Sequence, residues 1–178
     1  LLAVCTYFRQ ELQLIFASCW MQLFHGRGNE HSRLGWLLMF GTIPVGLAGL
    51  LFDDFIENHL RSITVIALTT IVFGLLLGLA DKKGSHQLAM EQMAWRSAML
   101  IGLSQALALI PGTSRSGITM TAALALGYDR QTAARFSFLL AIPVIILSGG
   151  YKGLQLIGEP NVVAWGDIFL GIGLSAVT

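Results

Sequence analysis

The feature that most constrains the fold is an apolar stretch, residues 97–128, with a polar run at its centre. That run, residues 111–117, contains Arg115. One straight helix of this length would reach about 48 Å, too long for a bilayer core of about 30 Å, whereas two full spans need about 40 residues. We therefore predict two half-length helices that meet at 111–117 as a re-entrant hairpin, with the non-helical loop at membrane depth.

The composition is that of an integral membrane protein. Hydrophobic residues are 54% of the 178 residues and charged residues are 12%, whereas soluble domains hold about 25% charged residues. The net charge of +1 gives no basic field, which argues against nucleic acid as a partner. Cys5 and Cys19 have no metal-ligand spacing and are predicted to be packing residues.

Four further apolar runs predict membrane-spanning helices. Because no strand pattern competes with them, we expect an all-α, multi-span helical bundle. The runs are residues 34–52, 62–80, 130–149 and 162–178. Both ends of the chain lie inside apolar runs, so we expect residues 1–178 to be one transmembrane domain cut from a longer protein.

The connections follow from the polar residues between these runs. Polar turns are expected at 53–61 and 151–161, and a polar loop or surface helix at 81–96. Ser32 and Asp129 are the expected N-caps of the helices over 34–52 and 130–149. The pair Gly149-Gly150 is expected to end the latter.

Residues 10–24 place apolar side chains on one face of a helix that Gly26 and Gly28 would end. This pattern fits a helix along the membrane interface or a short amphipathic connector, and both remain open.

Small residues within two of the spans predict close helix packing. Gly74 and Gly78 form a small-xxx-small pair, and Pro44 is expected to kink its helix. Glycines also occur in the span over 34–52, at Gly41, Gly46 and Gly49.

Lysine and arginine are distributed unevenly between the two sides of this layout. The segments before residue 34, at 81–96 and at 129–135 hold 8 of them, whereas the turns at 53–61 and 151–161 hold 2. The positive-inside rule places the first set in the cytoplasm. The hairpin loop is therefore expected to enter from the cytoplasmic side.

Arg115 is a functional-site hypothesis because a guanidinium is costly to bury in hydrocarbon. A helix that starts near residues 116–118 leaves free N–H groups at the loop, and such ends bind phosphate. Arginine adds a planar set of donors suited to phosphate oxygens. The nearest acidic residue along the chain is Asp129, so the loop is predicted to bind phosphate or diphosphate.

The other loop residues suit the same anion. The hydroxyls of Thr113, Ser114 and Ser116 can donate to it, and Gly112 and Gly117 allow the backbone to approach closely. The alternative is that Arg115 pairs with a carboxylate elsewhere in the bundle and the serines only cap helices.

The remaining polar residues are weaker candidates. Ser104, Gln105 and Thr119 could face the loop, but the sequence does not settle their rotation. Arg135 is expected to reach the cytoplasmic surface. Several others are expected to be solvated: His25, His31, His59, His86, Asp53, Asp54 and Glu57.

A diphosphate site at membrane depth suggests a lipid-linked substrate, and three segments carry a resemblance to a known family. Residues 106–117 read ALALIPGTSRSG, residues 136–143 read FSFLLAIP and residues 41–44 read GTIP. The first resembles the second signature of the bacterial undecaprenyl-diphosphate phosphatases, the bacitracin-resistance family. Type 2 phosphatidic-acid phosphatases are excluded, since no histidine lies between Arg115 and Asp129.

The resemblance implies two inverted repeats, each with a re-entrant hairpin, in the bacterial inner membrane. It implies hydrolysis of undecaprenyl diphosphate, a polyprenyl diphosphate lipid, to recycle the carrier for peptidoglycan synthesis. It assigns the diphosphate to Arg115, with Ser114 in the same site. It also implies a divalent cation, Mg or Ca, whose ligands lie outside this chain.

The family's first repeat carries paired glutamates and a Ser-Ser-Thr-Gly-His run, and neither occurs here. These 178 residues alone are therefore predicted to be inactive. A secondary transporter or lipid flippase that binds an anionic headgroup at the loop is the alternative function. A homodimer also remains open.

Overall fold

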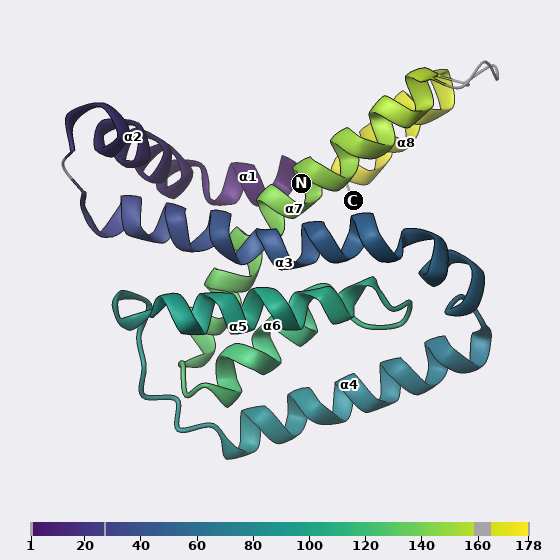
Figure 1. Ribbon diagram of the computed structural model, residues 1–178, viewed down its shortest axis with the longest axis horizontal. Coiled ribbons are helices and arrows are strands. Elements are labelled where there is room, and N and C mark those ends of the chain that lie inside the picture. Colours follow the sequence, from purple (N-terminus) through teal and green to yellow (C-terminus); the bar gives the residue numbers. More distant parts are fainter. Residues whose placement is uncertain (1, 27, 159–164, 178) are drawn as a thin grey trace.

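The computed structural model describes residues 2–26, 28–158 and 165–177, and helices joined by short connections make up most of them (Figure 1). An isolated bridge pairs Leu88 with Tyr128. The α-helices are α1 (Leu2–Tyr7), α2 (Arg9–His25), α3 (Glu30–His59), α4 (Ile63–Lys83), α5 (Trp95–Ala106), α6 (Arg115–Ala125), α7 (Arg130–Gly158) and α8 (Trp165–Val177), and two short 3-10 helices are η1 (Met90–Gln92) and η2 (Leu107–Leu109). The predicted all-α class is confirmed.

Three of these helices contain segments long and apolar enough to cross a membrane. The segments are Glu30–Phe52, Ile63–Lys83 and Arg130–Gly153. They overlap the runs predicted at 34–52, 62–80 and 130–149. The protein is therefore a multi-span helical membrane protein. Of the run predicted at 162–178, α8 covers Trp165–Val177, and the rest lies outside the described residues.

Two predicted helix ends are wrong. The expected turn at 53–61 is mostly helical, because α3 continues to His59. No glycine or proline occurs there to stop it, and polar side chains are tolerated at a helix end. Likewise α7 runs through Gly149-Gly150 to Gly158. Glycine inside a helix costs about 1 kcal/mol, which tertiary context overrides. Residues 159–161 of the turn predicted at 151–161 lie outside the described residues.

Two predicted helix ends are confirmed, and Ser62 is a cap that was not predicted. Ser62 Oγ accepts a hydrogen bond from Val65 N at 3.2 Å, whereas the predicted cap Asp129 accepts one at Oδ1 from Thr132 N at 2.6 Å. Gly26 ends α2 in the left-handed conformation, at φ 68°. The prediction for α3 is wrong by one turn. Asn29 is its N-cap, and Ser32 completes a reciprocal capping box as the third helical residue.

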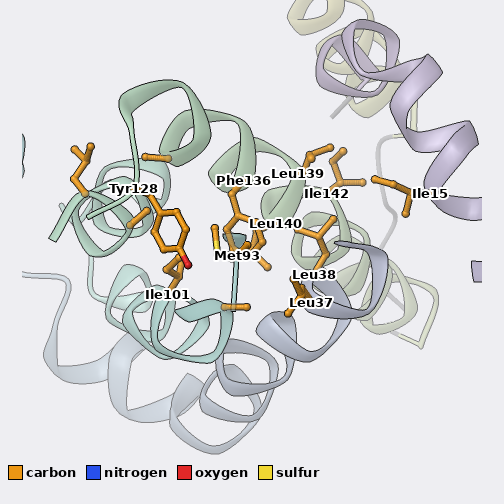
Figure 2. Close-up of a cluster of buried hydrophobic side chains, with 14 residues drawn as sticks. Ile15, Leu37, Leu38, Met93, Ile101, Tyr128, Phe136, Leu139, Leu140 and Ile142 are labelled. Atoms are coloured by element: carbon orange, nitrogen blue, oxygen red, sulfur yellow. The ribbon is translucent and has the colours of Figure 1, made fainter. Parts of the chain in front are cut away.

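The core lies where α3, α5, α6 and α7 meet (Figure 2). Leu37, Ile101, Phe136 and Leu140 lie in it, and each is at most 2% exposed. Aliphatic and aromatic burial of this kind is the main favourable term that fixes the bundle.

A glycine contact brings α3 and α5 close together. A Cβ atom on Gly102 would overlap the carbonyl oxygen of Gly41, so the two helices cross backbone to backbone. The prediction of close packing is confirmed at Gly41. At Gly74 and Gly78 a Cβ atom would meet no described atom within 4 Å, so close packing there stays a prediction.

The ends of the α5–α6 pair are tied together by the chain around Tyr128. Leu88 N donates to Gly127 O at 3.0 Å, and Asp129 N donates to Leu88 O at 2.9 Å. Tyr128 is 1% exposed, and its hydroxyl accepts from Ala94 N at 3.3 Å. These bonds fix the base of the pair, so its loop lies at the other end, between α3 and α4 (Figure 1).

Candidate functional site

The loop that was singled out in the sequence joins α5 to α6. After η2, Ile110 is extended at φ −74° and ψ 121°, as the following proline requires. Thr113 N donates to Ile110 O at 3.1 Å, and Gly112 takes φ 91°, a conformation that favours glycine. The helix is therefore broken at residues 110–114, whereas residues 115–117 of the predicted loop belong to α6.

Ser114 is the N-cap of α6. Its Oγ accepts a hydrogen bond from Gly117 N at 3.2 Å and lies 3.4 Å from Ser116 Oγ. The cap uses a lone pair of the hydroxyl oxygen, so the hydroxyl hydrogen still has to be donated elsewhere. Ser114 is exposed and Ser116 is partly buried. Capping by Ser114 and donation to an anion are therefore compatible.

The first turn of α6 has unused backbone donors. Ile118 N donates to Ser114 O at 2.9 Å. Among the described residues, no acceptor is found for the backbone N–H of Arg115 or Ser116. The first N–H groups of a helix lack partners inside the helix, and they carry its positive end.

Arg115 is the first residue of α6 and its side chain is partly buried. Its guanidinium forms no hydrogen bond and no ion pair with any residue that the structure describes. The alternative that a carboxylate of this chain neutralises Arg115 therefore finds no support among those residues. Its five donors are available to a planar or tetrahedral oxyanion.

Two more polar side chains near the loop lack partners. Gln105, in the last turn of α5, is 0% exposed, and neither its Oε1 nor its Nε2 has a hydrogen-bond partner among the described residues. The same holds for the buried Thr113 Oγ1. Native proteins leave few such groups, and each needs an explanation. Both residues lie within ten positions of Arg115. The chain near Arg115 therefore has further donors and acceptors that a ligand could bind.

A buried hydroxyl pair joins the start of α6 to α7. Thr119 Oγ1 lies 2.6 Å from Ser137 Oγ, and Ser137 Oγ donates to Ser116 O at 3.4 Å. Ser104 Oγ, in contrast, donates to Ile101 O at 2.6 Å within its own helix. Of the three residues with undetermined rotation, Thr119 thus faces α7 and contributes to the position of α6.

Two residues that the sequence did not single out contact the loop from α4. Thr69 Oγ1 donates to Pro111 O at 2.7 Å, and Thr70 Oγ1 donates to Gly112 O at 3.0 Å. They lie 42 residues away along an otherwise apolar span. No pattern in the sequence pointed to this contact.

The expectation for Arg135 is incomplete. Its side chain is partly exposed, and it also pairs with Glu11 of α2, with Nη2 2.7 Å and Nε 3.0 Å from Glu11 Oε1. The two side chains are 41% and 17% exposed. A cavity of about 470 Å³ lies beside this pair, between α1 and α7. The loop at residues 110–117 does not line this cavity.

The fold and the loop define a class of protein: a multi-span helical membrane protein with an unpaired arginine at a broken-helix loop. The comparison with known protein families agrees with this class. The family model described as bacitracin resistance protein BacA matches residues 1–178, and the chain belongs to that family.

Relatives share this sequence over nearly its whole length. An undecaprenyl-diphosphatase from Teredinibacter turnerae is 58% identical over 179 residues, which cover 100% of this chain and 67% of the relative. One from Saccharophagus degradans is 53% identical over 176 residues, 99% of this chain and 66% of the relative. The chain thus spans about two thirds of the length of these relatives.

Proposed function

We propose that the complete protein hydrolyses undecaprenyl diphosphate to undecaprenyl phosphate and inorganic phosphate. The reaction recycles the lipid carrier for peptidoglycan synthesis at the bacterial inner membrane. Membership of the BacA family and the names of the relatives support this assignment. The observation that carries it is Arg115, a partly buried cation at a helix N-terminus for which the described residues supply no acceptor.

We also propose that α5 and α6 form a re-entrant hairpin. At about 1.5 Å per residue, the 12 residues of α5 and the 11 of α6 reach about 18 and 17 Å, roughly half of a bilayer core. The hairpin is then the second member of an inverted repeat, and the first lies in the third of the relatives that this chain does not cover.

Within this site Arg115 and Ser114 act on the diphosphate. Hydrolysis adds water across a phosphorus–oxygen bond of the diphosphate, and negative charge shifts toward the bridging oxygen that leaves. Arg115 binds the phosphate oxygens, and its fixed charge stabilises this developing charge. Ser114 and Ser116 donate from their hydroxyls, and Thr113, Gly112 and Gly117 complete the loop around the anion. These roles lie within one copy of the chain, so they do not require a homodimer.

The residues that the structure describes do not form a metal site. Among those that the structure describes, no group of three or more His, Cys, Asp or Glu side chains lies close enough together to hold an ion. We therefore assign no step to a metal. The divalent cation expected from the family would take its ligands from the uncovered third, together with the nucleophile and the acid–base groups.

Phosphate release from undecaprenyl diphosphate by the purified full-length protein tests the proposal. We expect turnover by the wild type, a loss of about a hundredfold to a thousandfold or more in Arg115→Ala, and no rescue by Arg115→Lys, which lacks the planar fork. Arg96→Ala is the matched control, because Arg96 is exposed. The 178 residues alone should release no phosphate.

Two outcomes would contradict the proposal. Turnover retained in both Arg115 variants would overturn the role given to Arg115 in binding the diphosphate. Labelled lipid that crosses vesicle membranes without any phosphate release would favour the transporter or flippase, since half-helix ends at the midplane also bind anions in transporters.

A further inference from the structure

The contact between α4 and the loop is the starting point. None of the described α4 side chains is fully buried, and the helix lies against α6. Its hydrogen bonds to the loop come from the hydroxyls of Thr69 and Thr70, which donate to Pro111 O at 2.7 Å and Gly112 O at 3.0 Å. Adjacent residues of α4 thus hold adjacent carbonyls of the loop.

Each hydroxyl has one hydrogen to donate and a choice of acceptors. Thr69 Oγ1 also lies 2.8 Å from Val65 O, and Thr70 Oγ1 lies 2.8 Å from Ile66 O. Those carbonyls already accept the backbone N–H of residues 69 and 70 in a regular α-helix. No other donor to Pro111 O or Gly112 O is found among the described residues. Without the two threonines, these loop carbonyls would therefore lack a hydrogen bond from those residues.

The loop lies directly on α4 at this point. A Cβ atom on Gly112 would overlap both Thr69 Oγ1 and the carbonyl oxygen of Ile66. Gly112 also has φ 91°, so a larger residue there would be strained as well as crowded. The close approach and the two hydrogen bonds fix the same two residues of the loop.

This contact matters for an anion site because carbonyl oxygens carry partial negative charge and repel phosphate. An anion-binding loop has to direct N–H groups toward the ligand and give its carbonyls other partners. Thr69 and Thr70 supply those partners to Pro111 and Gly112, four and three residues before the start of α6 at Arg115. These two carbonyls therefore already have donors on α4.

We propose that Thr69 and Thr70 are positioning residues for the diphosphate site: their hydroxyls hold the carbonyls of Pro111 and Gly112 on α4 and so fix the loop that presents Arg115. This inference rests on the proposed function, because it assigns the loop to a diphosphate. Neither threonine contacts the substrate in this account. Both act through the backbone of the loop.

Paired substitutions in the full-length protein separate the hydroxyl from the methyl group. Thr69→Val with Thr70→Val keeps the shape and removes both hydroxyls, whereas Thr69→Ser with Thr70→Ser keeps the hydroxyls and removes the methyl groups. Thr64→Val is the matched control, since Thr64 is an exposed residue of the same helix. The readouts are kcat and KM for undecaprenyl diphosphate, amide hydrogen exchange across residues 111–118 and the melting temperature.

We expect the double valine variant to lose about tenfold in kcat/KM, equivalent to about 1.4 kcal/mol. Its loop amides should exchange faster, and its melting temperature should stay near the wild-type value. The double serine variant and Thr64→Val should resemble the wild type. Valine variants with normal kcat/KM and normal exchange would overturn the proposal, and so would serine variants as impaired as the valine variants, which would indicate methyl packing.

The same experiment distinguishes failure of the positioning role from failure of the function. If the wild type releases no phosphate, the proposed function is wrong, and hydrogen exchange alone decides whether the hydroxyls hold the loop. If the double valine variant does not fold, the single variants Thr69→Val and Thr70→Val give the same comparison, with a smaller loss expected in each.

Discussion

Arg115 is the first residue of α6, and Arg135 lies in the second turn of the next helix, α7. Both side chains are partly buried. Arg135 is matched by Glu11, with its Nη2 2.7 Å from Glu11 Oε1. Arg115 has no acceptor among the described residues. Burying a cation is tolerated when a partner compensates the lost hydration. Arg135 therefore joins two helices of this chain, whereas Arg115 is left for the anion that we propose as its ligand.

The other described arginines that we compare either have a partner within the chain, as Arg135 does, or are exposed to solvent. Arg130 pairs with Asp81, its Nε lying 2.6 Å from Asp81 Oδ1. Arg33 donates to the carbonyl oxygens of Glu91 and Met93. Arg9 and Arg96 are exposed. Among these described arginines, Arg115 alone combines partial burial with the lack of an acceptor.

The largest effect on stability within this comparison is expected from breaking the paired arginine. Arg135→Ala leaves Glu11 without its partner, and Glu11 is only 17% exposed. Because Arg135 is 41% exposed, we discount the cost of a fully buried pair to about 1–2 kcal/mol of stability. Thermal unfolding should shift downward by a few degrees, whereas Arg115→Ala should leave the midpoint nearly unchanged.

The double variant Glu11→Gln with Arg135→Gln checks the cause. It removes both charges, so it should recover much of the stability that Arg135→Ala loses. An Arg115→Ala variant that destabilises the protein as much as Arg135→Ala would erase the distinction between the two arginines.

A smaller effect is expected from a substitution at Gln105, which should lower activity without lowering stability. Its buried amide has no partner among the described residues, so Gln105→Leu removes an uncompensated polar group and should leave stability unchanged or slightly higher. If the amide serves the site, phosphate release should still fall by about tenfold. Lower stability with normal turnover would instead give Gln105 a structural role.

Local sequence signals predicted the parts of the site that depend on local chemistry. The length of the stretch 97–128 and the polar run at its centre predicted the break, and a helix start was predicted near residues 116–118, close to the observed start at Arg115. The apolar runs predicted three of the long helices. Each of these features is decided within one or two turns of chain, where proline geometry, capping and burial act directly.

Features that depend on contacts between distant residues were not predictable. Glu11 and Arg135 are 124 residues apart, and Thr69 and Pro111 are 42 apart. The ends of α3 and α7 also escaped prediction, since polar residues after Phe52 and the glycines at 149 and 150 are compatible with both a helix and a turn. Tertiary context decided between them.

The central claim is that Arg115 binds the phosphates of a lipid, and ligand affinity tests it most directly. The measurement is the Kd of the full-length protein for a polyprenyl diphosphate analogue whose bridging oxygen is replaced by methylene, which prevents hydrolysis. We predict that Arg115→Ala weakens binding by about a hundredfold, or about 2.7 kcal/mol, and that Arg135→Ala binds like the wild type. Equal affinity in the wild type and Arg115→Ala would contradict the account.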